Sequence, residues 1–125
     1  MKIVAFFYLA ITAPAFGQLK WDNLEQTFAP KSQDKLVVAK YRFINAGTLP
    51  VRIDEVQTSC GCTTATLAKK EYAPGESGKI EAKFNFAGRI GHQEKWILVT
   101  TDSTPEQPIV LRLVVNIPRS AGNIP

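Results

Sequence analysis

Apolar and polar residues alternate along several short runs of this chain, and the alternation limits what the chain can fold into. Over residues 79–86 it is unbroken, and over 109–117 every second residue is a large apolar one. Successive side chains of an extended strand point to opposite faces, so a period of two gives a strand one apolar face. No run of ten or more residues shows the apolar period of an α-helix. The sequence therefore predicts an all-β domain.

Six or seven short strands are expected. Phe84 lies on the apolar side of the cleanest alternating run, and Lys83 lies on its polar side. In one other run the period slips by one residue, which a β-bulge near Asp54 and Glu55 would repair. The expected strands lie at 18–30, 35–44, 51–58, 79–86, 95–101 and 109–117, and the first of them is an irregular edge strand.

Glycine and proline mark the turns between these runs. Gly47 follows the strand expected at 35–44. Pro74 and Gly75 stand in the order that a type II turn requires, because glycine accepts the positive φ of the third turn position. Gly91 belongs to a Gly-rich connection expected at 87–92.

Short strands with turns between them, in about 100 residues, predict an immunoglobulin-like antiparallel β-sandwich of about seven strands. The expected domain spans 18–118, and Pro118 ends its last strand. Residues 119–125 are expected to form a flexible C-terminal tail. The strands carry enough apolar surface for a core that does not depend on a crosslink.

Residues 1–17 have the features of a secretory signal peptide. Lys2 precedes an apolar run at 3–11, and Ala15 and Gly17 are the small residues of a cleavage site. The apolar run is shorter than the roughly 20 residues that span a bilayer. We therefore expect an exported protein, periplasmic or secreted, whose mature chain begins at Gln18 and has no membrane span.

The charge of the chain argues against a nucleic-acid partner. It has 15 basic and 11 acidic residues and a net charge of +4. Without Lys2, 14 basic residues remain against the same 11 acidic ones, a net charge of +3. The basic residues are scattered, so they do not form the stripe that nucleic-acid binding needs. We expect a monomer.

The order of several motifs resembles that of the bacterial family known as domain of unknown function 1573. The resemblance covers roughly residues 25–117, and it implies an immunoglobulin-like, Hydin-type module exported to or anchored in the cell envelope. No activity is established for the family. His92 and Trp96 are not part of the family pattern. The matching motifs are Phe43-x-Asn45-x-Gly47, Ser59-Cys60-Gly61-Cys62-Thr63, Pro74-Gly75-Glu76-x-Gly78, Phe84, Gly91 and Lys95-x-Ile97-x-Val99-x-Thr101.

Cys60 and Cys62 are the only cysteines, and three states are open to them. In a disulfide the β-carbons lie about 3.5–4.5 Å apart, whereas a straight strand would hold the two side chains about 6.5–7 Å apart. The backbone must then fold tightly, and Gly61 can take the angles required. A ring this small is relatively easy to reduce. Alternatively, the two thiols remain free and partly buried.

Metal binding is the third state, because soft thiolate ligands favour Cu(I) or Zn. Two-coordinate Cu(I) needs only Cys60 and Cys62. A closed zinc site needs two further ligands. His92 and Glu94 would supply them if the 88–92 loop folded back toward the cysteines.

Nothing in the sequence indicates an enzyme. It has no phosphate-binding loop, paired-carboxylate signature or nucleophile elbow. Thiol oxidoreductases usually carry Cys-x-x-Cys at the start of a helix, whereas Cys60 and Cys62 are separated by one residue and no helix is expected.

Trp96 and Leu98 are candidates for a partner-binding surface. If Ile97 and Val99 face the core, Trp96 and Leu98 face outward, and exposed aromatic residues often anchor partners. Alternatively, the segment 19–21 covers them. We therefore expect a non-enzymatic interaction or structural module that binds an unknown envelope or extracellular protein. The alternative is a small metal-binding or redox protein that uses Cys60 and Cys62.

Overall fold

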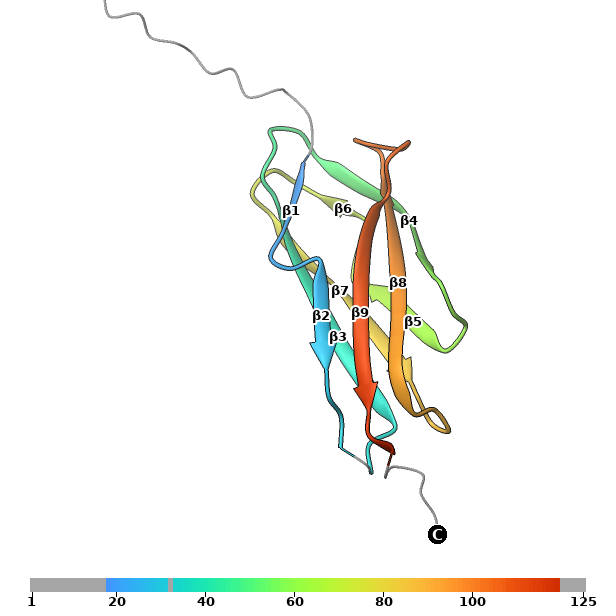
Figure 1. Ribbon diagram of the computed structural model, residues 1–125. Coiled ribbons are helices and arrows are strands. Elements are labelled where there is room, and N and C mark those ends of the chain that lie inside the picture. The colour runs from blue at the N-terminus through green and yellow to red at the C-terminus, as the bar shows by residue number, and fades with distance from the viewer. Residues whose placement is uncertain (1–17, 32, 120–125) are drawn as a thin grey trace, which may run out of the picture.

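Two β-sheets pack face to face in the computed structural model, which describes residues 18–31 and 33–119 (Figure 1). This confirms the predicted all-β sandwich, with nine strands in the described part instead of about seven. The expected signal peptide at 1–17 and nearly all of the expected tail lie outside the described residues. The strands are β1 (Leu19–Trp21), β2 (Glu25–Phe28), β3 (Leu36–Asn45), β4 (Val51–Thr58), β5 (Thr63–Leu67), β6 (Glu71–Tyr72), β7 (Ser77–Asn85), β8 (Gly91–Thr101) and β9 (Ile109–Ile117).

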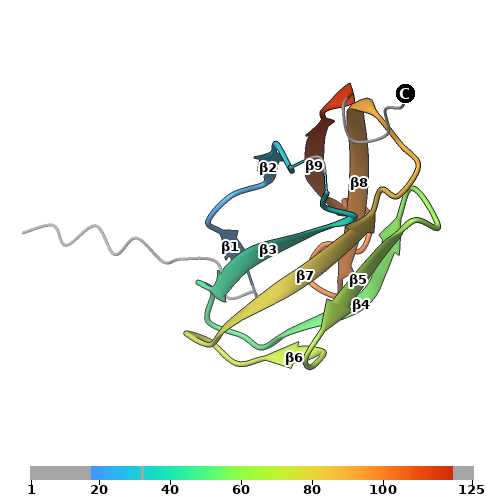
Figure 2. The same cartoon turned by 90° about the horizontal axis from the view of Figure 1, so that it is seen from below.

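The four-stranded sheet has the order β1-β3-β7-β5, and the five-stranded sheet has the order β2-β9-β8-β4-β6. The view from below shows the two layers (Figure 2). All neighbouring strands run antiparallel except β2, which pairs with β9 in parallel. Within the described ranges there is no helix long and apolar enough to cross a membrane.

The prediction of a single edge strand at 18–30 is wrong, because this segment forms two strands in different sheets. β1 pairs with the end of β3, and β2 pairs with β9. Trp21 of β1 packs against Phe43, with ring centroids 4.8 Å apart, and Phe28 of β2 also packs against the core. Each half thus buries its own aromatic residue.

Two strands were missed, and a third is longer than expected. β5 carries mainly threonine and alanine, whose period is weak, and it forms because it pairs with β7. β6 has only two residues and pairs with the start of β4. The connection expected at 87–92 is shorter than predicted, because Gly91 and His92 already pair with Ile117 and Asn116 of β9. β8 begins with polar residues, so the start of this strand shows no alternation of apolar and polar residues in the sequence.

The inward faces of the strands form the core, as the alternation predicted. The β3 residues Val37, Ala39, Tyr41 and Phe43 are all buried. In β7 and just beyond it, Ile80, Ala82, Phe84 and Phe86 are buried as well. The predicted bulge in β4 is confirmed by a register shift between Ile53 and Glu55 against β8.

The two predicted turns that precede β4 and β7 are confirmed. Gly75 has a φ of 81°, and the Glu76 amide donates a hydrogen bond of 2.9 Å to the Ala73 carbonyl, as in a type II turn. Gly47 follows β3, and its amide donates to the side-chain oxygen of Asn45 at 3.0 Å.

Gly78 allows two rings to meet at one end of the sandwich. A β-carbon on Gly78 would lie 2.4 Å from the Tyr72 ring and 2.8 Å from the Phe43 ring. These rings contact each other edge to face, with centroids 4.8 Å apart. A β-carbon on Gly61, by contrast, would have no atom within 4 Å.

We expect Gly78→Ala to lower the free energy of unfolding by about 1–3 kcal/mol, because the methyl group would overpack the rings of Tyr72 and Phe43. The matched control is Gly61→Ala, which should change stability by no more than about 0.5 kcal/mol. Denaturant unfolding of both variants measures the difference. Equal effects would contradict this packing.

Phe84→Ala should lower the free energy of unfolding by about 3–5 kcal/mol, since it empties a fully buried position of β7. Lys83→Ala removes an exposed side chain, 3.8 Å from Glu81, and should change stability by less than about 0.5 kcal/mol. Chemical denaturation tests both variants, and comparable losses would show that the strand faces are assigned wrongly.

Candidate functional site

The outer face of the five-stranded sheet carries the predicted partner-binding residues. Ile97 and Val99 are fully buried, so their neighbours on β8 point outward as the sequence predicted. Trp96 is 40% exposed, and Leu98 is partly exposed. Trp21 does not cover them, because β1 lies in the other sheet and Trp21 packs on Phe43.

Trp96 and Leu98 have neighbours on β9 that extend the surface. Leu98 pairs with Val110, which is 46% exposed, and Trp96 pairs with Arg112. Paired residues of antiparallel strands share a face. We call the surface formed by Trp96, Leu98, Val110 and Arg112 the Trp96 face.

Cys60 and Cys62 form a disulfide in the turn between β4 and β5. Their α-carbons are 5.2 Å apart, and the Thr63 amide donates to the Cys60 carbonyl at 3.1 Å. The tight fold that a disulfide requires is thus present. Gly61 does not have the positive φ of Gly75 and Gly91, so no left-handed backbone is needed there.

The disulfide turn adjoins the Trp96 face through Ser59. The Ser59 amide donates to the Trp96 carbonyl at 2.9 Å, and the Trp96 amide donates to the Ser59 hydroxyl at 3.0 Å. Cys60 follows directly, and both cysteines are partly exposed. The disulfide turn is therefore bonded to the middle of β8, at the residue that carries the exposed indole.

His92 does not join the cysteines. It lies on β8 four residues before Trp96, which corresponds to about 13 Å along a strand. In the described ranges, no group of three or more His, Cys, Asp or Glu side chains is arranged to hold a metal ion. The four side chains considered for a zinc site are therefore not brought together.

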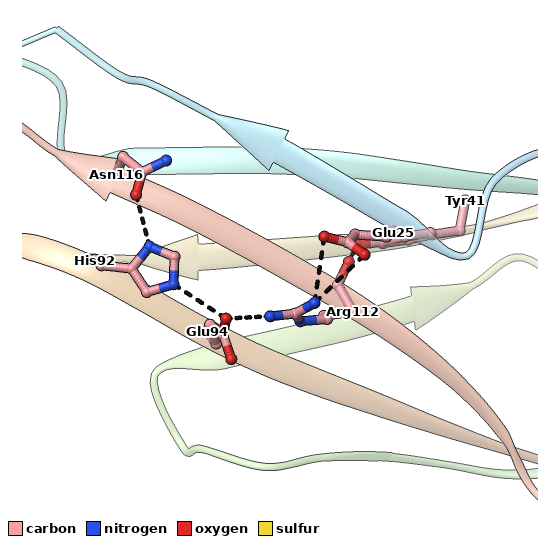
Figure 3. A network of polar contacts seen from close by, with 6 residues as sticks. All are labelled: Glu25, Tyr41, His92, Glu94, Arg112 and Asn116. Carbon is pink, nitrogen blue, oxygen red and sulfur yellow. Dashed lines mark hydrogen bonds and ion pairs between the residues drawn. The ribbon is translucent and has the colours of Figure 1, made fainter.

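His92 instead belongs to a chain of polar contacts on the outer face (Figure 3). Its Nδ1 lies 2.7 Å from Asn116 Oδ1, and its Nε2 lies 3.0 Å from Glu94 Oε1. The Arg112 guanidinium forms ion pairs with Glu94 and, at 3.4 Å, with Glu25 of β2. This network occupies the surface beside Trp96.

Both partners of the His92 ring are acceptors, so the doubly protonated imidazolium satisfies them best. The hydrogen bond to Glu94, and then that to Asn116, raises the pKa of His92 above its ordinary value. The hydrogen bonds from His92 and then Arg112 lower the pKa of Glu94.

Tyr41 connects this network to the core. Its hydroxyl donates a hydrogen bond of 2.6 Å to the backbone carbonyl of Arg112, across the sandwich. Burial, with a smaller contribution from Glu25, raises the pKa of Tyr41, so the hydroxyl remains a donor. The roles of Glu25, Arg112 and Asn116 depend on the pairing of β2, β8 and β9, so sequence reasoning missed them. The one available signal was that Arg112 and Asn116 lie on the outward side of the alternating run at 109–117.

A hollow on the opposite sheet has a different character. It has a volume of about 610 Å³ and is open to solvent. Arg42, Lys69 and Lys79 line it together with one carboxylate, Asp22, and it contains neither the histidine nor a cysteine.

His92 is the only histidine, so its titration is directly observable by NMR. We expect its pKa to lie above 6.5 in the folded protein, and Glu94→Gln to lower it. A raised folded-state pKa stabilises the fold fully below the unfolded value, and this contribution disappears as pH rises through the folded value. The stability difference between wild type and His92→Gln should therefore be larger at pH 5.5 than at pH 8.5. A difference independent of pH would contradict the network.

The sequence model of one family, described as "Protein of unknown function (DUF1573)", matches residues 19–117. None of the curated proteins matches this chain.

Solved structures with the same fold share little sequence with the chain. A protein of unknown function from Porphyromonas gingivalis W83 has a TM-score of 0.70 at 16% identity over 88% of this chain, which spans only 51% of that one. The PapD-like domain 7 of human CEP192 has a TM-score of 0.59 at 14% identity, covering 94% of this chain and 96% of that one. The E. coli chaperone DraB has a TM-score of 0.59 at 12% identity, covering 86% and 58%. These similarities show the fold alone.

Proposed function

The chain belongs to the DUF1573 family of proteins of unknown function, and we propose that it is a non-enzymatic protein-interaction module of the cell envelope or the extracellular space. The proposed location rests on the signal-peptide features of residues 1–17. The proposed role rests on the Trp96 face.

The exposed indole of Trp96 is the observation that carries this proposal. Trp96, Leu98 and Val110 form an exposed apolar surface on the outer side of the β8–β9 pair. Tryptophan supplies a large contact area with little conformational entropy to lose, and it is enriched among residues that dominate binding energy. Arg112 and Glu94 border this surface and can set the orientation of a partner.

Sandwiches of this fold include proteins named as chaperones, among them DraB and YadV. Their names support a role in binding polypeptides. Because the sequence identity is low, the partner of this chain has to be inferred from the chain's own surface. We propose that the partner is an envelope or extracellular protein that places an apolar side chain against Trp96 and polar groups against Arg112.

Binding of Cu(I) or Zn remains a prediction. A disulfide sulfur is not a thiolate, so Cys60 and Cys62 can bind metal only after reduction. Because His92 lies in the Glu94 network, the reduced pair would suit two-coordinate Cu(I) better than a closed zinc site.

A photo-crosslinking amino acid in place of Trp96 tests the interaction role in the cells that make the protein. The crosslinking amino acid is an aromatic one, so that a ring still occupies the position of the indole, and we expect a discrete covalent adduct from this position. The matched control is the same amino acid in place of Leu36, which is 49% exposed on the outer face of the other sheet. Trp96→Ala should abolish the adduct formed by a crosslinker at Val110, because the anchor is gone. Adducts that form equally at positions 96 and 36, or survive Trp96→Ala, would reject the Trp96 face as the binding surface.

A further inference from the structure

The Cys60–Cys62 disulfide does not have the usual purpose of a structural crosslink. It joins residues two apart in sequence, and so short a loop removes little entropy from the unfolded chain. β4 and β5, which flank it, are already held by β8 and β7. The disulfide can therefore be reduced while β4 and β5 stay paired with β8 and β7.

We propose that Cys60 and Cys62 form a thiol–disulfide exchange site that accepts two electrons from a thiol pair of a polypeptide. Both cysteines are partly exposed, although Cys62 also packs against the core, and the exchange requires an external thiolate to reach Cys62 from its exposed side. The Ser59–Trp96 hydrogen bonds place this turn beside the apolar Trp96 face, where a polypeptide can lie. The site thus combines an accessible disulfide with an adjoining surface for its substrate.

The two sulfurs have different surroundings. The Cys62 amide lies 3.2 Å from Cys60 Sγ and donates a hydrogen bond to it. The polar neighbour of Cys62 Sγ is the Thr63 hydroxyl at 3.9 Å, which is a longer contact. A hydrogen bond to the charged form favours that form, so a thiolate is better stabilised on Cys60. Cys60 is therefore the leaving group when the disulfide is attacked.

Two lysines lie on the strands beside the turn, and residues 58–64 contain no carboxylate. Lys83 of β7 pairs with Thr64, and its Nζ lies 3.8 Å from Glu81 Oε1. Lys95 of β8 lies over the Phe84 ring, 5.5 Å from its centroid, and Phe84 pairs with Thr63. An approaching substrate thiolate, which is negatively charged, therefore meets no carboxylate of the turn itself.

The reaction proceeds in two exchanges. A substrate thiolate attacks Cys62 Sγ, the Cys60–Cys62 bond breaks, and Cys60 leaves as a thiolate. The second substrate thiolate then attacks the substrate sulfur of the mixed disulfide, and Cys62 leaves as a thiolate. The substrate thiol pair is oxidised to a disulfide, and Cys60 and Cys62 are reduced to two thiols that take up the two protons. The electrons and protons balance without a further reactant.

The test equilibrates the folded, purified protein with reduced and oxidised glutathione, and then with a reduced model peptide that has two cysteines. We expect the Cys60–Cys62 disulfide to be reduced reversibly, with one peptide disulfide formed for each protein dithiol, as counted by alkylation and mass spectrometry. The double variant Cys60→Ser with Cys62→Ser should remain folded, with a melting curve close to that of wild type, and should oxidise no peptide. A disulfide that reacts only in denaturant would overturn the proposal.

Single variants test the difference between the two sulfurs. Cys62→Ser keeps Cys60, and Cys60→Ser keeps Cys62. A hydrogen bond to the sulfur increases the thiolate fraction, and the weaker nucleophilicity of that thiolate offsets part of the gain in rate. We therefore expect Cys62→Ser to react with iodoacetamide about threefold faster than Cys60→Ser at pH 6.5. Equal rates, or the reverse order, would overturn the assignment of Cys60 as leaving group.

Two readouts on the wild-type protein separate this proposal from the interaction role. Exchange with glutathione needs no docking surface, so it can be measured apart from the crosslinking of a partner. If exchange persists while no partner crosslinks at position 96, the exchange site stands and the interaction role fails. If a partner crosslinks but the folded protein does not exchange, the exchange site fails alone.

Discussion

The buried side chain of Asn45 holds one end of the sandwich together. Its amide nitrogen donates to the carbonyls of Leu49 at 2.8 Å and Tyr72 at 3.0 Å, and its oxygen accepts from the amides of Gln18 at 3.3 Å and Gly47 at 3.0 Å. Both donors and both acceptor positions of the amide are therefore used. A buried polar group without a partner costs about 1–3 kcal/mol, so loss of the Asn45 side chain would destabilise the backbone groups that it bonds. This one residue at the end of β3 fixes the entry to β1, the β3–β4 turn and the short strand β6.

The Asn45 end of the molecule is thus closed by polar contacts and by the aromatic rings over Gly78, while the disulfide turn joins β4 to β5 elsewhere. The fold does not rely on a crosslink where its strands already pair over long registers. This division leaves the disulfide turn and the Trp96 face exposed without weakening the core. Exposure of a tryptophan and of a reducible bond is then compatible with a stable domain, because the burial that stabilises the domain comes from other residues.

Arg112 shows how the core and the outer surface are joined. Its backbone carbonyl accepts the hydrogen bond of the buried Tyr41 hydroxyl, and its side chain lies between the carboxylates of Glu25 and Glu94. The hydrogen bond from Tyr41 to the Arg112 carbonyl fixes the position of β9. The ion pairs of the Arg112 side chain align Glu25 and Glu94, and Glu94 contacts His92. The polar border of the Trp96 face is therefore held from below as well as within the surface.

The alternating pattern by itself determined that the chain is a β-sandwich and which residues face the core in β3, β7 and β9. These features follow from the alternation of apolar and polar residues, which can be read within the sequence of each strand. The tertiary structure alone decided that residues 18–30 divide between two sheets, that residues 63–67 form a strand, and that Glu25, His92, Glu94, Arg112 and Asn116 form one network. It also decided that Cys60 and Cys62 are bonded to each other and that His92 lies away from them. Strand register and turn geometry bring together residues as far apart as Leu24 and Arg112, and no local pattern records such pairings.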